Sequence, residues 1–221
     1  MRFKERFRHG YTSQRAKRAD LMFLQHMLAV MKSGGMMATV MPHGVLFRSR
    51  SEQDIRQSIL EEDLLEAVIG LPPNLFYGTG IPACILVLRP PGAKPPDRRG
   101  KVLFINADAE YREGRAQNFL LPAHIEKIAT TFHKFHDVPR YARVVAIEEL
   151  AANDYNLNIR RYADNAPPPE PHDVRAHLLG GVPKPELVAQ RELFDAVGLS
   201  PNAVFEPGEG RYAHFRPDLT E

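Results

Sequence analysis

The segment that most constrains the fold is residues 65–88, in which two short apolar runs flank a connection rich in proline and glycine. The runs, 67–71 and Ala83–Leu88, contain valine and isoleucine and have the length of buried β-strands. The connection, residues 70–82, is too long for a tight hairpin and too rich in Gly and Pro for a crossover helix. Strands joined without a crossover helix are usually antiparallel, so we predict an antiparallel pair. A long loop that carries an aromatic pair, Phe76-Tyr77, between two core strands is a typical place for a binding site.

The remaining patterns predict an α/β chain with a distinct second part. Further strands are predicted at 36–41, 101–105 and 144–146, and helices from Asp20 to before Gly34, at 51–60 with Ser51 and Asp54 as a capping box, and at 122–135. After Tyr162 prolines accumulate, and one more helix is predicted at about 185–196. We therefore divide the chain into a domain at 1–164 and a proline-rich linker with a helical tail at 165–221. The tail is expected to dock on the first domain or on a partner.

Composition indicates a soluble globular protein. The 221 residues are 43% hydrophobic and 25% charged, enough for one core with an appended segment. No apolar run reaches the roughly 18 residues of a membrane span, and the first residues lack the apolar core of a secretory signal. The single cysteine, Cys84, fits a reducing compartment, and its apolar strand predicts a small buried hydrophobe. A cytoplasmic protein without membrane contact is expected.

The first eighteen residues are basic, with seven Lys or Arg residues against the single acid Glu5. Clustered cations interleaved with aromatic residues favour contact with nucleic-acid phosphates. The alternative is a solvated, partly disordered terminus. The candidate phosphate-binding residues are Arg2, Lys4, Arg6, Arg8, Arg15 and Lys17.

Histidines occur at two positions of interest. His43 follows the strand at 36–41 in a Pro42-His43-Gly44 turn, at the strand end where open α/β sheets bind ligands. It either faces such a site or lies in solvent. His133 and His136 stand three residues apart, but no carboxylate or cysteine is at ligand spacing, so no metal site is predicted. A metal-dependent hydrolase has little support.

Several ordered segments closely resemble the methyltransferase (modification) subunit of type I restriction–modification systems, an N6-adenine DNA methylase family. The matching segments are 19–26, 41–48, 69–82, 117–118, 153–158 and 173–183. They are long, occur in the family's order and cover essentially the whole chain.

The resemblance implies a partial Rossmann-like methyltransferase sheet. The family's strand order is 3-2-1-4-5-7-6, and on that map 36–41 is the fifth strand, 67–71 the sixth and Ala83–Leu88 the seventh. The chain is thus expected to carry strands 5, 7 and 6 with flanking helices. The family's Gly-rich cofactor motif and its Asn-Pro-Pro-aromatic motif do not occur in the sequence. The chain is therefore expected to begin after the catalytic motif, to end short and to be inactive alone. The open edge of the fifth strand is expected to cause self-association or to require the missing N-terminal half.

The resemblance also implies a reaction and its partners. The family transfers a methyl group from S-adenosylmethionine to adenine N6 in DNA. A specificity subunit chooses the DNA site, and a restriction subunit joins for cleavage. The alternative, from another class, is a non-catalytic DNA-binding or protein-interaction module derived from this fold.

The resemblance assigns candidate site residues to the loop after the sixth strand. In related methylases an aromatic residue there forms one wall for the flipped adenine, which here implies Phe76, with Tyr77 as second choice. Packing of Phe76 on the sheet as a loop anchor is the alternative. Pro42, His43, Asn74 and Thr79 are placed at the edge of the site. No catalytic or cofactor-binding residue is assigned within the chain.

Overall fold

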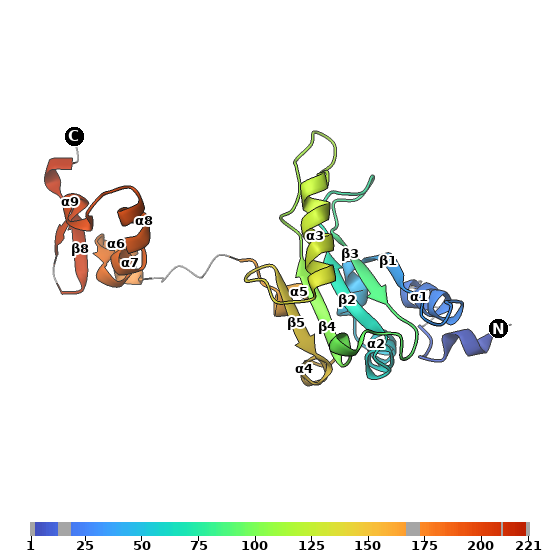
Figure 1. The fold of residues 1–221 in the computed structure, drawn as a ribbon. Coiled ribbons are helices and arrows are strands. Elements are labelled where there is room, and N and C mark those ends of the chain that lie inside the picture. The colour runs from blue at the N-terminus through green and yellow to red at the C-terminus, as the bar shows by residue number, and fades with distance from the viewer. Residues whose placement is uncertain (1–2, 13–18, 167–172, 209, 220–221) are drawn as a thin grey trace. The chain divides into compact units, whose positions relative to one another are not determined.

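The computed structural model describes residues 3–12, 19–166, 173–208 and 210–219. It divides into two compact units, Met1–Ala166 and Pro167–Glu221 (Figure 1). Of the candidate phosphate-binding residues, Arg2, Arg15 and Lys17 lie outside the described part of the chain.

The first unit alternates helices and strands. In chain order its elements are η1 (Lys4–Phe7), α1 (Asp20–Ala29), β1 (Met37–Pro42), η3 (His43–Leu46), α2 (Ser51–Glu61), β2 (Leu65–Gly70), β3 (Ala83–Leu88), η4 (Pro96–Arg98), β4 (Lys101–Asn106), α3 (Pro122–Lys134), β5 (Ala142–Ala146), α4 (Ile147–Ala152) and α5 (Ile159–Tyr162), where η denotes a 3-10 helix.

The five strands form one sheet in the order β1-β3-β2-β4-β5. β3 lies between β1 and β2 and is antiparallel to both, with Met41 opposite Cys84 and Ile69 opposite Ile85. The predicted antiparallel pair and the order of strands five, seven and six are therefore confirmed. β4 adds a parallel neighbour to β2, and β5 is antiparallel to β4. The sequence did not predict the pairing of these last two strands.

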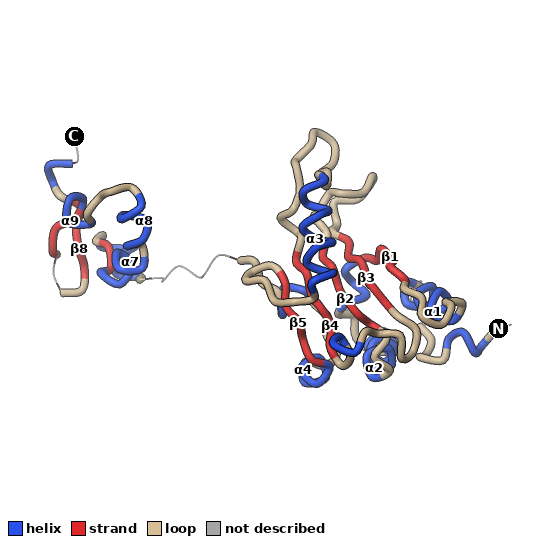
Figure 2. Tube along the Cα trace, in the orientation of Figure 1, coloured by secondary structure: helices blue, strands red, loops and turns tan. Residues whose placement is uncertain are grey.

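The sheet is covered on both faces, which explains the continuous apolar runs in its central strands. On one face, Val68 belongs to a core with Leu21 of α1 and Ile59 of α2. On the other face, Ile69 belongs to a core with residues of α3 such as Phe132. Figure 2 shows the strands as a single layer with α3 across one face. Cys84 is fully buried, and its thiol donates to the Met41 carbonyl oxygen over 3.4 Å, so it is a small buried hydrophobe as predicted.

Helix α2 has the predicted position but not the predicted cap. Arg50 occupies the N-cap position with a positive φ of 64°, and its side chain makes no capping hydrogen bond. The capping box of Ser51 and Asp54 is therefore wrong, because Ser51 is already the first helical residue. The helix is anchored by Arg56, which is 4% exposed.

The second unit is a small mixed module. Its elements are α6 (Val174–Leu179), β6 (Val182–Pro183), α7 (Lys184–Ala189), α8 (Arg191–Ala196), α9 (Pro201–Val204), β7 (Phe205–Pro207), β8 (Tyr212–Phe215) and η5 (Pro217–Leu219). The helix predicted at about 185–196 is two helices that meet at Gln190. The three-stranded sheet β6-β8-β7 was not predicted, because its strands are two to four residues long.

One aspartate joins the start of the second unit to its sheet. The Oδ1 of Asp173 accepts from the backbone N–H groups of Arg175 and Ala176, and the Tyr212 hydroxyl donates to its Oδ2 over 2.9 Å. These bonds cap α6 and fix it against β8. Across the described residues of both units, no helix is long and apolar enough to cross a bilayer.

Candidate functional site

Three segments meet at one edge of the first unit's sheet. β1 and β2 are both antiparallel to β3, and β4 is parallel to β2, so the carboxyl ends of β1, β2 and β4 share this edge. His43 follows β1, the loop 71–82 follows β2, and the segment 107–121 follows β4. The last two extend beyond the strand ends at the top of the view (Figure 1). Open α/β sheets bind ligands at such an edge.

The loop 71–82 is closed by its own backbone. The N–H of Asn74 donates to the Gly80 carbonyl oxygen over 3.3 Å, and Phe76 and Thr79 form an antiparallel bridge. Asn74 and Gly78 have positive φ values of 53° and 75°. These are angles that glycine and asparagine adopt most readily. The turn residues therefore hold the tip of the loop in one shape.

The two candidate stacking residues are both at the surface. The Phe76 side chain is 40% exposed and that of Tyr77 is 88% exposed. Phe76 thus retains accessible surface at the loop. Thr79 accepts a hydrogen bond from the Ile81 N–H through Oγ1 at 3.1 Å, a contact that shapes the loop.

The segment 107–121 fixes the loop from the side. Asn118 is 7% exposed, and its backbone N–H donates to the Asn74 carbonyl oxygen over 2.7 Å. Its side-chain amide donates to the Pro73 carbonyl oxygen over 2.8 Å. Asn118 therefore holds two consecutive carbonyls at the base of the loop. Sequence reasoning used the Gln117-Asn118 pair for the family match without assigning it a role.

His43 occupies the start of η3 and does not lie free in solvent. Its Nε2–H donates to the Ala83 carbonyl oxygen over 3.0 Å, so it ties β1 to the end of the 71–82 loop. Burial lowers the pKa of His43 below its ordinary value, against the raising effect of that hydrogen bond and of Asp108. The neutral imidazole at pH near 7 is suited to this structural hydrogen bond. Pro42 precedes it as the exposed last residue of β1.

Polar groups after β4 connect the same edge to α5. The side-chain amide of Asn106 donates to the Ala163 carbonyl oxygen over 2.9 Å. Arg160 pairs with Asp108 at 2.8 Å, and Asn165 also donates to Asp108. Sequence reasoning did not single out these residues. For Asn106 and Asp108, the position at or just after the end of an apolar strand was the available signal.

The described part of the basic arm is folded onto the helices. The backbone N–H of His9 donates to the Gln25 side chain over 3.1 Å, and its Nδ1 lies 2.8 Å from the Ser58 hydroxyl. Arg8 pairs with Glu62, the residue that follows α2. Residues 3–12 are therefore attached to the helices, while side chains such as Arg8 remain exposed. Lys4 and Arg6 lie on η1, with Lys4 exposed and Arg6 stacked on the Phe3 ring at 4.1 Å.

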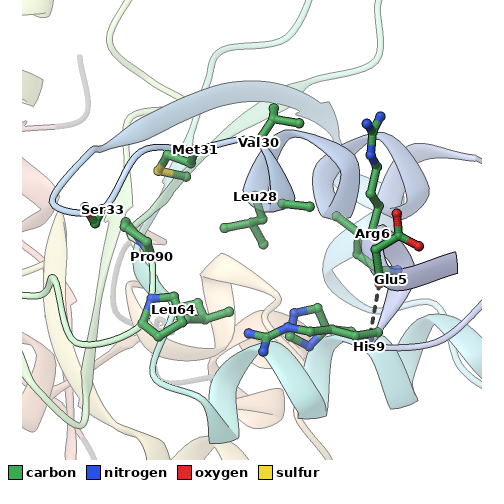
Figure 3. A pocket seen from close by; sticks show the side chains of 13 residues that line it. Glu5, Arg6, His9, Leu28, Val30, Met31, Ser33, Leu64 and Pro90 are labelled. Atoms are coloured by element: carbon green, nitrogen blue, oxygen red, sulfur yellow. Dashed lines mark hydrogen bonds between the residues drawn. The ribbon is translucent and has the colours of Figure 1, made fainter. Parts of the chain in front are cut away.

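A pocket of about 620 Å³ lies between this arm and the end of α1. Figure 3 shows Leu28, Val30 and Met31 on one side and His9 on another, with Leu64 and Pro90 closing it. Leu64 precedes β2 and Pro90 follows β3, so the pocket lies at the opposite sheet edge from the 71–82 loop.

Metal and thiol chemistry find no support among the described residues. No cluster of three or more His, Cys, Asp or Glu side chains there is arranged to hold a metal ion. The ring of His133 packs against Phe132 with centroids 5.6 Å apart. Burial raises the pKa of the Cys84 thiol to about 12, so it is not a nucleophile.

Comparison with known families gives one consistent match. The family model described as N-6 DNA Methylase matches residues 1–170. The methylase subunit of type I restriction enzyme MjaVII from Methanocaldococcus jannaschii is 37% identical over 174 residues, 77% of this chain and 29% of that protein. The MpnII methylase subunit from Mycoplasma pneumoniae is 32% identical over 170 residues, 77% of this chain and 31% of its own length. The chain thus spans less than a third of these relatives.

Comparison with solved structures also finds methyltransferase subunits of type I systems. The methyltransferase subunit of the type I restriction–modification system from Streptococcus thermophilus superposes with a TM-score of 0.62 at 42% identity, over 66% of this chain and 31% of that one. The M protein of type I restriction enzyme EcoKI superposes with a TM-score of 0.54 at 18% identity, and the match covers 84% of this chain and 45% of the EcoKI protein. At that identity the second match shows a shared fold.

Proposed function

The chain belongs to the N-6 DNA methylase family, and we propose from this premise that it supplies the target-base side of a DNA methyltransferase acting on adenine N6. The observation that carries the proposal is the 71–82 loop, which presents a half-exposed Phe76 at the carboxyl edge of the sheet. An adenine inside a duplex cannot present its amino group to a methyl donor, so the base must leave the stack. A rigid loop with an accessible ring at this edge is suited to receive it.

Phe76 supports the extruded base by stacking. A base on an aromatic ring is stabilised by about 1–3 kcal/mol, which offsets part of the cost of unstacking. The backbone that carries the ring is held by the bridge between Phe76 and Thr79 and by Asn118 at the base of the loop. Tyr77, which is 88% exposed, is the second candidate, because the resemblance matches Phe76.

The methyl donor is held by residues outside this chain. The family implies S-adenosylmethionine, but the sequence carries neither its Gly-rich motif nor the Asn-Pro-Pro-aromatic motif. The pocket beside the basic arm, at about 620 Å³, lies at the opposite edge from the loop. With neither motif in the sequence, no residue of this chain is assigned to the methyl donor, and the chain alone is proposed to be inactive.

The partners follow from the same relatives. Their names place them in type I restriction enzymes, so we extend to this chain an assembly with DNA, a specificity subunit and a restriction subunit. A further segment that completes the sheet and carries the cofactor motif is part of this proposal. The second unit, with its many exposed apolar side chains such as Leu178 and Val188, is proposed to dock within that assembly.

The stacking role is tested by replacing Phe76 with alanine. The probe is a labelled DNA duplex with one extrahelical adenine, compared with the fully paired duplex. The unmodified chain should prefer the extrahelical adenine by about 1–3 kcal/mol, a factor of ten for each 1.4 kcal/mol. Phe76→Ala should lose most of this preference in fluorescence anisotropy titrations, while binding of the paired duplex stays unchanged.

Phe215→Ala is the matched control, since Phe215 is an exposed phenylalanine of the second unit. It should keep the full preference. A Phe76→Ala protein that retains the preference would remove Phe76 from the site, and loss of preference in Tyr77→Ala alone would move the role to Tyr77. A chain with no preference for the extrahelical base would contradict the proposed function.

A further inference from the structure

The segment 107–121 contains a defined hairpin beside the 71–82 loop. Arg112 and Phe119 exchange two backbone hydrogen bonds of 2.9 Å each. A side chain at Gly114 would collide with the Gln117 carbonyl oxygen and the Phe119 ring, so the tip requires glycine. The hairpin is therefore a built element and not merely a connection between β4 and α3.

The hairpin and the loop form one surface. Asn118 precedes Phe119 in the hairpin, and it donates hydrogen bonds to the carbonyl oxygens of Pro73 and Asn74. Asn74 lies two residues before Phe76 in the loop. Because the anchoring side chain is buried, the two segments are held in a fixed relation. Exposed aromatic rings gather on this surface, from Phe76, Tyr77, Tyr111 and Phe119.

The acidic residues at the base of the hairpin are paired with cations, whereas the arginines beyond them are exposed. At the base, Asp108 is neutralised by Arg160 and Glu110 by Lys127. Arg112 at the bridge and Arg115 near the tip are both exposed and stand against the single acid Glu113. The Arg112 guanidinium lies over the Phe119 ring, 5.7 Å from its centroid. For Arg115 no ion pair is found within the described ranges.

Arginine beside exposed aromatic rings is the chemistry that binds an unstacked nucleic-acid strand. The guanidinium contacts phosphate oxygens, and the rings accept bases without sequence preference. We propose that this hairpin is a second DNA-contacting element, in which Arg112 and Arg115 neutralise phosphates flanking the extruded adenine. The inference rests on the proposed function and adds to it the part of the chain that holds the strand.

The test is the salt dependence of DNA binding by the double variant Arg112→Ala/Arg115→Ala. Each lost phosphate contact reduces the slope of log K against log salt by about 0.9. The double variant should therefore reduce the slope by about two and weaken binding equally for paired and extrahelical-adenine duplexes. The single variant Arg115→Ala leaves the Arg112–Phe119 contact in place and should reduce the slope by about one.

Lys32→Ala/Lys134→Ala is the matched control, because it also removes two exposed positive charges. Lys32 precedes β1, and Lys134 ends α3 beside His133, whose carbonyl accepts from Arg98 before β4. Both therefore lie toward the opposite edge, and their removal should leave the slope unchanged.

A double arginine variant with the slope of the unmodified chain would overturn the inference, and the hairpin would then face a protein or solvent. If Phe76→Ala still loses the adenine preference in that case, the proposed function stands; if the unmodified chain binds no DNA, both fail.

Discussion

His9 shows how one buried side chain ties the amino-terminal segment to two helices. Its backbone N–H donates to Gln25 of α1, and its ring faces Ser58 of α2 and Glu62 directly after that helix. Burial lowers the pKa of His9 below its ordinary value, opposed by Glu62 and assisted by Arg8. The folded protein therefore holds this imidazole neutral more strongly than the unfolded chain does.

The sign of the resulting pH dependence follows from proton binding. Below a pH of about 6.5 the unfolded state binds the His9 proton more readily, so the free energy of unfolding falls as the pH falls. Above that pH the group contributes no slope. His9→Asn should flatten the loss of stability between about pH 7 and pH 5, measured by urea unfolding at several pH values. The exposed His136→Asn variant controls for loss of an imidazole, and an equal slope in His9→Asn and the unmodified chain would contradict the prediction.

At the scale of elements, Arg56 joins α2 to the η3 segment just before it and to a segment 99 residues further along the chain. Its guanidinium donates to the carbonyl oxygens of Val45 and Arg48 around η3, and to that of Tyr155 before α5. Burial lowers its pKa to about 10, so it remains charged at neutral pH. Arg56 is therefore the polar anchor that fixes α2 to both segments.

Removing this anchor should destabilise the first unit strongly. Arg56→Met keeps most of the side-chain volume but leaves three carbonyl groups without their donor. At about 1–3 kcal/mol for each buried unsatisfied group, discounted for partial exposure, the free energy of unfolding should fall by about 2–4 kcal/mol. Chemical denaturation measures it, with Arg50→Met as control because Arg50 is exposed at the N-cap position. A loss below that of the control would show that water replaces the guanidinium.

The sequence predicted the elements that local apolar patterns determine. It did not predict side-chain contacts that depend on residues far away in the chain. The strands around the 71–82 loop and helix α3 follow from apolar periodicity and from flanking glycine and proline. No sequence pattern singled out Glu66, which is fully buried between Arg89 and Arg98 at 2.6 and 2.7 Å. Asn118 reads as a turn former. Its role depends on a loop more than forty residues earlier, which no local pattern reveals.

At the scale of the whole molecule, the first unit has an open sheet edge. In the described residues β1 pairs with β3 alone, so its other side presents backbone groups without a strand partner. On that strand Val40 is 50% exposed, whereas the central strand β2 is buried throughout. An apolar strand with a free edge is a template for pairing with another chain.

We therefore expect this chain to self-associate through β1 when it is purified by itself. Val40→Lys places a charge on the edge strand and should weaken association by roughly tenfold or more in sedimentation equilibrium. Ile125→Lys is the matched control. Ile125 is 53% exposed on α3, so this variant also replaces an exposed β-branched residue by lysine, but away from the sheet edge. If Ile125→Lys disrupts association as much as Val40→Lys, the contact involves α3 and not the strand. A chain that stays monomeric at all concentrations would show that the edge is protected, and the free backbone groups of β1 would then have to be satisfied by water.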